Sequence, residues 1–193
     1  MTTRAERAEE TRLRILRAAF DLQSRSLASD IGLAAIAHEA GVSVQTVLRR
    51  FGSRDALFDE AIRFANQTVA EERRAPVGDP RAAVRVIVDH YERRGDFALM
   101  MLAQETTYEH VRRMSDAGKA MHRTWVTDVF GPQLADLAAA PRQETTDLLV
   151  IATDVYAWKL LRHDRGLSRS QTEQRLNTLV TAVLTAAALR KDT

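Results

Sequence analysis

The sequence IAHEAGVSVQTVLRRF, at residues 36–51, predicts two short helices joined by a tight turn. Gly41 stands where the first helix must end, because glycine adopts a positive φ without a Cβ clash. Ser43 is the expected N-cap of the second helix, and Val47 and Phe51, four residues apart, form its buried stripe. This is the geometry of a helix-turn-helix, whose second helix enters the DNA major groove. An ordinary αα-hairpin with a glycine cap has the same turn, so the turn alone leaves that alternative open.

The segments on either side favour the DNA-binding interpretation. Residues 11–20 have the spacing of an amphipathic helix, with Leu13, Leu16 and Phe20 on one face. After the turn, Ser53 is the expected N-cap of a further helix.

Across about residues 11–58 the chain resembles the TetR family of bacterial transcriptional regulators, of the TetR/AcrR type. The family pattern, T-R-x-x-I-L-x-A-A-x-x-L and then I-A-x-x-A-G-V-S-x-x-T-[LV]-Y-x-x-F-x-[ST]-[KR]-x-x-L, finds nearly every anchor here. The resemblance implies an all-α fold with an N-terminal three-helix helix-turn-helix DNA-binding domain and a C-terminal helical bundle for ligand binding and dimerisation. We expect the DNA-binding domain at residues 1–58, with its connecting helix running to about 74, and the ligand-binding and dimerisation domain at residues 75–193.

Three places depart from the family pattern. Leu48 stands where the family usually has a tyrosine that touches a phosphate, and Gly32 where a Ser or Thr usually caps the second helix. The segment at residues 26–31 lacks the usual glycine–aromatic pair. Arg50 and Arg54 stand in the usual histidine and lysine positions, and we expect them to compensate as phosphate clamps. DNA binding should survive with altered contacts.

The candidate DNA contacts lie on and beside the second helix of the turn. Ser43 should aim the helix N-terminus at a phosphate, Gln45 is suited to adenine, and Arg49 to guanine. Arg50 and Arg54 should set register through phosphates rather than read bases. The full set is Ser43, Val44, Gln45, Thr46, Arg49, Arg50 and Arg54.

The formal net charge is only +2, so DNA affinity cannot rest on bulk charge. Among the 28 basic residues nearly all are arginines, which suits phosphates and guanine edges but equally suits a GC-rich genome. Affinity has to come from local clusters, which are Arg49, Arg50 and Arg54 on one edge and Arg4, Arg7 and Arg12 in an expected mobile arm.

The absence of certain features narrows the function classes. Zero cysteines exclude disulfides and thiolate metal sites, which is compatible with a cytoplasmic location. The first residues have no apolar segment of signal-peptide type, and no run approaches the ~18 apolar residues of a membrane span. We expect a cytoplasmic protein with no membrane partner, no metal and no cofactor.

The rest of the chain is predicted to be helical. A linker at residues 75–80 ends in Asp79 as a cap and Pro80 as the first residue of a helix, which Gly95 is expected to end. Asp96 is then the expected cap of a short apolar helix. Thr106 and Glu109 have the spacing of a capping box for a long helix.

Two further helices are predicted at about residues 144–162 and 168–190. The first is apolar almost all round and the second has a wide apolar stripe, which favours a four-helix interface between two copies. The alternative is that both helices are interior to one monomer. A homodimer would also place two recognition helices one helical turn apart on a palindrome. The candidate interface residues are Trp158, Leu161, Leu179 and Val183.

In the family, the C-terminal domain usually encloses a small-molecule pocket. Soft or aromatic side chains with few polar partners suit a small apolar or amphipathic effector, although the same spacing is typical of plain helix core. The candidate pocket residues are Tyr91, Met100, Met101, Gln104, Met121, Trp125 and Tyr156. His90, His110 and His122 are candidates to orient a polar ligand group, or are surface or satisfied core histidines.

We therefore expect a sequence-specific, ligand-responsive homodimeric repressor that binds double-stranded DNA at a palindromic operator. No enzyme motif is present: there is no H-E-x-x-H, no G-x-S-x-G, no phosphate-binding glycine loop and no cysteine nucleophile. The alternative, supported by Leu48 and Gly32, is a helical protein-interaction adaptor that has lost DNA recognition.

Overall fold

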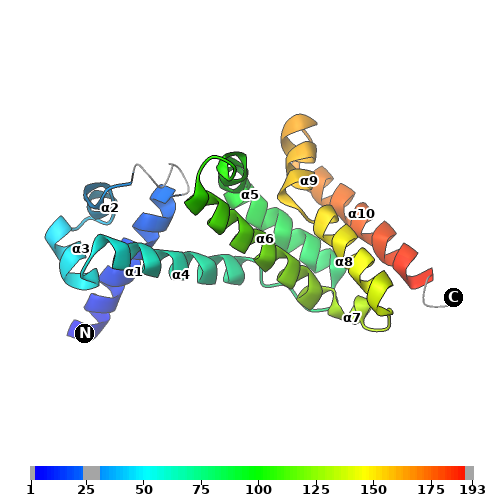
Figure 1. The fold of residues 1–193 in the computed structure, drawn as a ribbon, viewed down its shortest axis with the longest axis horizontal. Coiled ribbons are helices and arrows are strands. Elements are labelled where there is room, and N and C mark those ends of the chain that lie inside the picture. The colour runs from blue at the N-terminus through cyan, green and yellow to red at the C-terminus, as the bar shows by residue number, and fades with distance from the viewer. Residues whose placement is uncertain (1–2, 24–30, 190–193) are drawn as a thin grey trace. The chain divides into compact units, whose positions relative to one another are not determined.

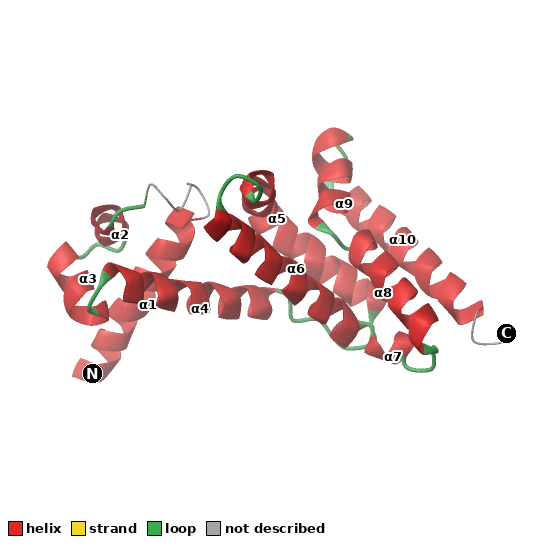
Figure 2. Ribbon diagram, viewed as in Figure 1, coloured by secondary structure: helices red, strands yellow, loops and turns green. Residues whose placement is uncertain are grey.

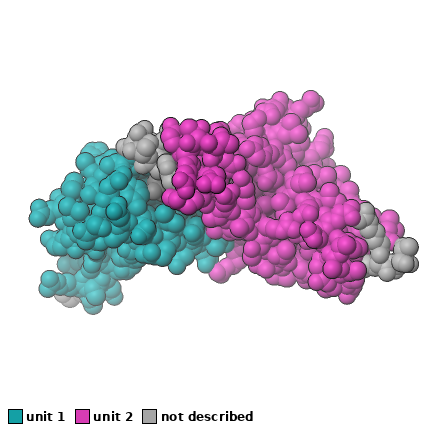
Figure 3. Space-filling view, viewed as in Figure 1, with its two compact units in different colours: residues 1–71 teal, residues 72–193 magenta. Residues whose placement is uncertain are grey.

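The computed structural model describes residues 3–23 and 31–189, and every regular element in these ranges is a helix (Figure 2). The predicted all-α fold is therefore confirmed. The chain divides into two compact units, residues 1–71 and residues 72–193 (Figure 3).

The first unit contains a short helix pair held by two longer helices. Its elements are α1 (Arg4–Gln23), α2 (Leu33–Glu39), α3 (Val44–Phe51) and α4 (Arg54–Glu72) (Figure 1). Apolar side chains from all four helices form one core, because each helix turns one apolar stripe inward. The side chains with no exposure at all include Ile15, Leu16, Ala19, Ile36, Val47 and Leu57.

The start of α1 corrects one expectation. The amino-terminal arginines were expected in a mobile arm, but α1 begins at Arg4. Thr3 and Glu6 form a reciprocal capping box, in which the Thr3 amide donates to the Glu6 carboxylate (2.6 Å) and the Glu6 amide donates to the Thr3 hydroxyl (3.2 Å). Arg12 is held by Glu60 of α4, with Nε 2.6 Å from a carboxylate oxygen. The arm is wrong because a Thr-x-x-Glu start signal was overlooked.

The second unit is a bundle around α5 and α10. Its elements are α5 (Pro80–Gln104), α6 (Glu109–Val129), α7 (Gly131–Leu134), α8 (Ala139–Ala152), α9 (Val155–Lys159), the π-helical turn η2 (Leu160–Asp164) and α10 (Arg169–Leu189). Helix α5 packs against α6, α9 and α10, and α8 packs against α6 and α10. The core includes Val84, Val88, Val126, Phe130, Leu149 and Leu176.

Helix α5 begins as predicted but does not break where expected. The Asp79 carboxylate accepts from the Ala82 amide (3.0 Å), and Pro80 is the first helical residue. The helix then continues through Gly95 to Gln104, so the predicted helix end is wrong. Gly95 is needed for packing instead: a Cβ there would lie 2.4 Å from Cζ3 of Trp158.

Two predicted helix starts nearby are also wrong. Asp96 caps no new helix because α5 runs past it. The N-cap of α6 is Tyr108, which makes no side-chain capping bond, so the Thr106–Glu109 capping box does not form.

The penultimate helix is interrupted where a single one was predicted. Helix α8 ends at Ala152, and Asp154 starts α9 by accepting from the Tyr156 amide (2.8 Å). The final helix begins with the predicted capping box, in which Ser168 and Gln171 exchange hydrogen bonds of 2.9 and 3.2 Å. The chain beyond Leu189, where the predicted helix end falls, lies outside the described residues.

In the ranges that the structure covers, no helix combines the length and apolar character that crossing a membrane requires.

Candidate nucleic-acid interface

The turn between α2 and α3 is fixed by one glycine in a left-handed conformation. Gly41 has φ +63°, and open space surrounds the position of a Cβ there, so conformation rather than crowding requires glycine. The amides of Gly41 and Val42 donate back to carbonyls of α2, over 3.0 and 2.9 Å. The predicted role of Gly41 is confirmed.

Helix α3 is held by one cap and two buried side chains. The Ser43 hydroxyl accepts from the Thr46 amide (3.1 Å), as predicted. Val47 is completely buried and Phe51 is 8 % exposed, so the predicted stripe is confirmed. Gly52, with φ +83°, ends the helix.

The opposite face of α3 is open to solvent. Gln45 and Arg49 are exposed, Val44 and Leu48 are 37 % and 40 % exposed, and Thr46 is half-buried. Arg49 makes no hydrogen bond or ion pair with any part of the chain that the structure describes. The structure thus gathers the candidate base-reading side chains on one exposed surface, while their contacts with DNA stay a prediction.

Two arginines beside α3 are held by the protein itself. A terminal nitrogen of Arg50 donates to the carbonyl of Ala8 in α1. The guanidinium of Arg54 lies 4.8 Å from the centre of the Phe58 ring, and its Nη2 lies 3.5 Å from the Ile31 carbonyl. Both charged ends are exposed side chains with restricted positions, which suits the predicted role in setting register.

The departures from the family pattern have visible local effects. Gly32 is the N-cap of α2, with extended backbone (φ −87°, ψ 159°) and no side chain to cap the first amides. Leu48 presents an apolar surface where a tyrosine would present a hydroxyl. The third departure, at residues 26–31, falls outside the described residues apart from Ile31.

The predicted pocket residues do not all lie together. Tyr91 is buried, donating its hydroxyl proton to the Thr153 carbonyl (3.0 Å), and it shares a cluster with Trp125. The Trp125 indole donates to the Arg73 carbonyl (2.7 Å). Tyr156, by contrast, is 55 % exposed. Of the remaining candidates, Met101 is buried and Met100, Gln104 and Met121 are half-buried.

Sequence reasoning missed a buried ionic cluster at the end of α4. His90 Nδ1 lies 2.9 Å from the Glu72 carboxylate, and Arg94 lies 3.2 Å from its other oxygen. Burial raises the pKa of Glu72, but the bonds from His90 and Arg94 outweigh it and lower this pKa to about 2. Burial likewise lowers the pKa of His90 to about 4, against the opposing effect of Glu72. No short sequence signal joins these residues, because the partners are far apart along the chain.

The predicted interface residues occupy different environments. Trp158 is 3 % exposed and donates to the Glu92 carboxylate (2.9 Å). Leu161 and Val183 are half-buried, and Leu179 is 44 % exposed. Other large apolar side chains of this unit are more exposed, and sequence reasoning did not single them out: Leu148, Ile151 and Leu160.

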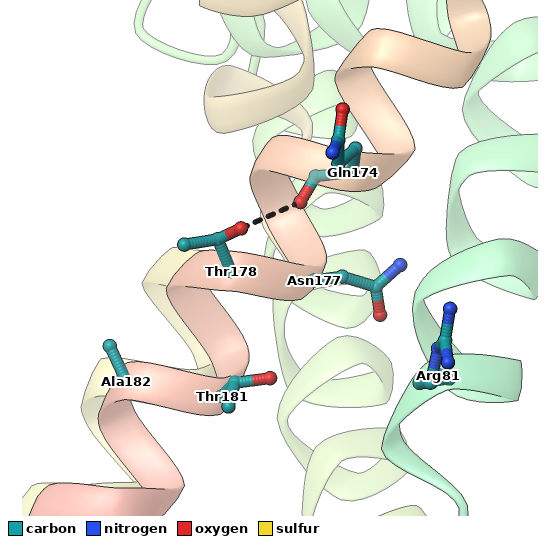
Figure 4. Close-up of a pocket in the computed structure, with 6 residues that line it drawn as sticks. All are labelled: Arg81, Gln174, Asn177, Thr178, Thr181 and Ala182. Atoms are coloured by element: carbon teal, nitrogen blue, oxygen red, sulfur yellow. Dashed lines mark hydrogen bonds between the residues drawn. The ribbon is translucent and has the colours of Figure 1, made fainter.

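An open hollow on the second unit involves none of the predicted pocket residues. It lies between the start of α5 and the side of α10, with polar side chains on its walls (Figure 4). Its lining residues are Arg81, Gln174, Asn177, Thr178, Thr181 and Ala182.

An exposed, capped recognition helix after a glycine turn defines the class of helix-turn-helix DNA-binding proteins. Within that class, residues 15–61 match the family described as bacterial regulatory proteins, tetR family. The fold is similar to that of a transcriptional regulator from Rhodococcus sp. Rha1, with 19 % identity and a TM-score of 0.62 over 91 % of this chain and 96 % of that one. It is also similar to a tetR-family transcriptional regulator from Streptomyces coelicolor, with 20 % identity and a TM-score of 0.64 over 98 % of this chain and 85 % of that one. No curated protein sequence matches this chain.

These findings confirm the resemblance to the TetR family. The chain is a TetR-family DNA-binding transcriptional regulator, and regulators of this family act by binding DNA rather than by catalysis.

Proposed function

We propose that this regulator is a ligand-responsive homodimeric repressor that reads a palindromic operator through α3. The observation that carries the proposal is the exposed face of α3, whose backbone position is set by the Ser43 cap and by buried Val47 and Phe51. A helix fixed in this way presents the same side chains to every DNA site it meets.

The side chains of α3 divide into readers and anchors. Gln45 suits the hydrogen-bonding edge of adenine, Arg49 that of guanine, and Val44 and the Thr46 methyl a thymine methyl group. Ser43, Arg50 and Arg54 face the phosphates in this arrangement and fix the register.

Exposed apolar side chains on the second unit support dimerisation. Leu148 and Ile151 of α8 are 42 % and 63 % exposed, and Leu179 of α10 is 44 % exposed. Apolar side chains grouped on helices in this way mark interaction surfaces. A twofold axis through α8 and α10 would make one surface serve both copies and match a palindrome.

The division of labour follows the proposed domains. Residues 1–58 read DNA, and residues 75–193 bind the second copy and a small apolar or amphipathic effector, with the connecting helix ending near residue 74. An effector acts by favouring one of two conformations of the dimer, and its effect cannot exceed its difference in affinity for them. A DNA-bound regulator of this kind works in the cytoplasm.

Selection of random duplex DNA on the purified chain tests the proposal. We expect a palindromic motif whose binding weakens steeply between two salt concentrations, because bound phosphates release counterions. Recovery of no motif, or of binding insensitive to salt, would favour a protein-interaction adaptor that has lost DNA recognition. The departures at Leu48 and Gly32 give that alternative its basis.

A further inference from the structure

An arginine in the second unit has a buried nitrogen and no counter-ion among the described residues. Arg73 follows α4, and its carbonyl accepts the Trp125 indole proton (2.7 Å), which fixes this segment on α6. The guanidinium carbon lies 5.8 Å from the centre of the Tyr91 ring, and Nε is buried without a hydrogen-bond partner. Within the described ranges, no hydrogen bond or ion pair reaches this guanidinium.

The acidic groups nearby are committed to other partners. Both oxygens of Glu72 are bound by His90 and Arg94. Asp154 accepts from a backbone amide (2.8 Å) to start α9. Because a buried charge without a counter-ion is costly, Arg73 is a strong binding group for an anion that comes from outside the chain.

A histidine beside this arginine offers an unused acceptor. His122 is 5 % exposed, and its Nε2 lies 3.2 Å from the Thr153 hydroxyl. That hydroxyl donates its only proton to the Leu149 carbonyl (2.7 Å), so it must accept from Nε2 of His122. Burial and the charge of Arg73 lower the pKa of His122 to about 4. The ring is therefore neutral at pH 7, with a bare Nδ1 that is buried and has no partner in the described part of the chain.

The two groups share one small region of the unit. The ring of His122 stacks on that of Trp125, with centres 5.7 Å apart and planes at 15°, and Trp125 in turn binds the Arg73 carbonyl. The charge of Arg73 also acts on Tyr91 and His90, so its guanidinium lies close to all of these rings. Ser115, two turns before His122 on α6, adds another buried hydroxyl without a partner among the described residues.

We propose that Arg73 and His122 form the polar end of the effector site and bind the carboxylate of a small monocarboxylic acid. This rests on the proposed function, because it assigns a ligand class to the effector of that regulator. The planar guanidinium donates to the carboxylate. One proton from water is taken up between a carboxylate oxygen and Nδ1 of His122.

The surroundings favour a monoanion with an apolar body. Among the described side chains around these rings, the guanidinium of Arg73 is the one permanent positive charge that is unpaired, whereas a phosphate group carries about −1.5 to −2 at pH 7. Tyr91, Trp125 and half-buried Met121 supply flat or adaptable apolar surface.

Proton uptake depends on the groups that face His122. These are Arg73 from the segment after α4 and His90 from α5, both of which lower its pKa, and the neutral Val150 carbonyl and Thr153 hydroxyl from the end of α8. An anion beside Arg73 offsets the larger of these positive influences, so binding raises the affinity of His122 for a proton.

Titration calorimetry on the full chain tests the proposal, with benzoate and octanoate as probes and benzamide and octanamide as uncharged matches. We expect at least one carboxylate to bind, with close to one proton taken up per molecule at pH 7 when two buffers of different ionisation enthalpy are compared. The amides should not bind detectably. Arg73→Gln should weaken carboxylate binding roughly 10- to 100-fold, the usual range for a hydrogen bond to a charged group.

Two further variants distinguish this site from binding elsewhere on the protein. His122→Gln should abolish proton uptake. Arg81→Gln removes an exposed arginine from the open hollow between α5 and α10 (Figure 4) and should leave binding unchanged. If circular dichroism shows that Arg73→Gln does not fold, Arg73→Lys keeps the charge without the fork and should still weaken binding several-fold.

Three results would overturn the inference: no carboxylate binds, inorganic phosphate binds in preference, or Arg81→Gln weakens binding while Arg73→Gln does not. The DNA selection described above, run on the same preparation, separates the two proposals. A palindrome recovered without carboxylate binding removes only the ligand assignment. Carboxylate binding without any DNA motif removes only the repressor.

Discussion

Glycine occurs in this chain for opposite physical reasons. Gly41 and Gly52 have positive φ and open space around the Cβ position, so their backbone conformation excludes other residues. Gly95 has ordinary helical backbone, and the Trp158 indole occupies the space of its missing side chain. One residue type therefore ends a helix in the first unit and lies inside one in the second.

Gly95→Ala should destabilise the second unit because its Cβ would overlap the Trp158 ring, and overpacking of this kind typically costs about 1–3 kcal/mol. Urea unfolding would measure the change. The matched control is Gly118→Ala on α6, where no atom lies within 4 Å of the Cβ position. That change should stabilise the helix by roughly 0.5–1 kcal/mol. Equal stability of the two variants would refute this account of Gly95.

Gln45→Ala and Arg50→Ala should affect DNA binding differently. Loss of Gln45 should cost about 1–3 kcal/mol on the preferred site and little on random DNA, because a base-edge contact carries sequence information. Loss of Arg50 should weaken binding to both kinds of DNA and reduce the salt dependence. Fluorescence anisotropy with operator and scrambled duplexes would distinguish these outcomes. Equal losses on both duplexes in both variants would contradict the division into readers and anchors.

At the scale of elements, local signals predicted the first unit better than the second. The turn at Gly41, the cap at Ser43 and the stripe of Val47 and Phe51 all depend on neighbours a few residues away, so spacing alone specified them. The continuity of α5 through Gly95 depends on Trp158, which is distant in sequence. No local pattern reports such a contact.

The same limit applies to the candidate sites. The exposed face of α3 follows from helical periodicity, so its members were predictable. The unpaired atoms of Arg73 and His122 follow from the packing of the α4–α5 link, α6 and α8 against one another. A sequence pattern gives His122 a position on a helix face, but not the hydroxyl that fixes its tautomer.

The contacts among α4, α5 and α6 should make stability depend on pH. Burial lowers the pKa of His90 and of His122 to about 4 in the folded chain, from an ordinary value of 6.5. The unfolded chain therefore binds protons more tightly, and the free energy of unfolding should fall as pH drops from about 6.5 to about 4. Each pKa unit corresponds to about 1.4 kcal/mol, so the loss should be on the order of a few kcal/mol.

Unfolding curves recorded across that pH range would check this expectation. His122→Gln should flatten the dependence, because one of the two titrating groups is removed. His38→Gln, at an exposed histidine of α2, is the control and should leave the slope unchanged. Parallel pH profiles for the two variants would show that His122 does not titrate in this way.

At the scale of the whole molecule, the proposed function needs two copies. The most exposed apolar side chains of α8 and α9 are those of Ile151 and Tyr156, at 63 % and 55 %. A monomer would leave these surfaces in water, whereas a second copy would cover them.

Ile151→Glu should convert the dimer to a monomer, because a carboxylate would be buried without a partner at the interface. Sedimentation equilibrium would measure the mass, and affinity for the palindrome should fall in parallel. Ile62→Glu, at a side chain of α4 that is 39 % exposed, introduces the same group in the first unit and should leave the mass unchanged. A dimer that survives Ile151→Glu would place the interface elsewhere.

The way α3 is attached has a consequence for how such a regulator diversifies. Left-handed glycines stand just before its cap and at its end, and only Val47 and Phe51 of its side chains join the core. Gln45, Leu48 and Arg49 are therefore open to exchange with little effect on folding. New binding specificity can arise at these positions by single substitutions, independently of the unit that would sense the effector. The helix is in this sense a replaceable reading head, and grafting its outward side chains onto a related regulator should transfer operator preference along with them.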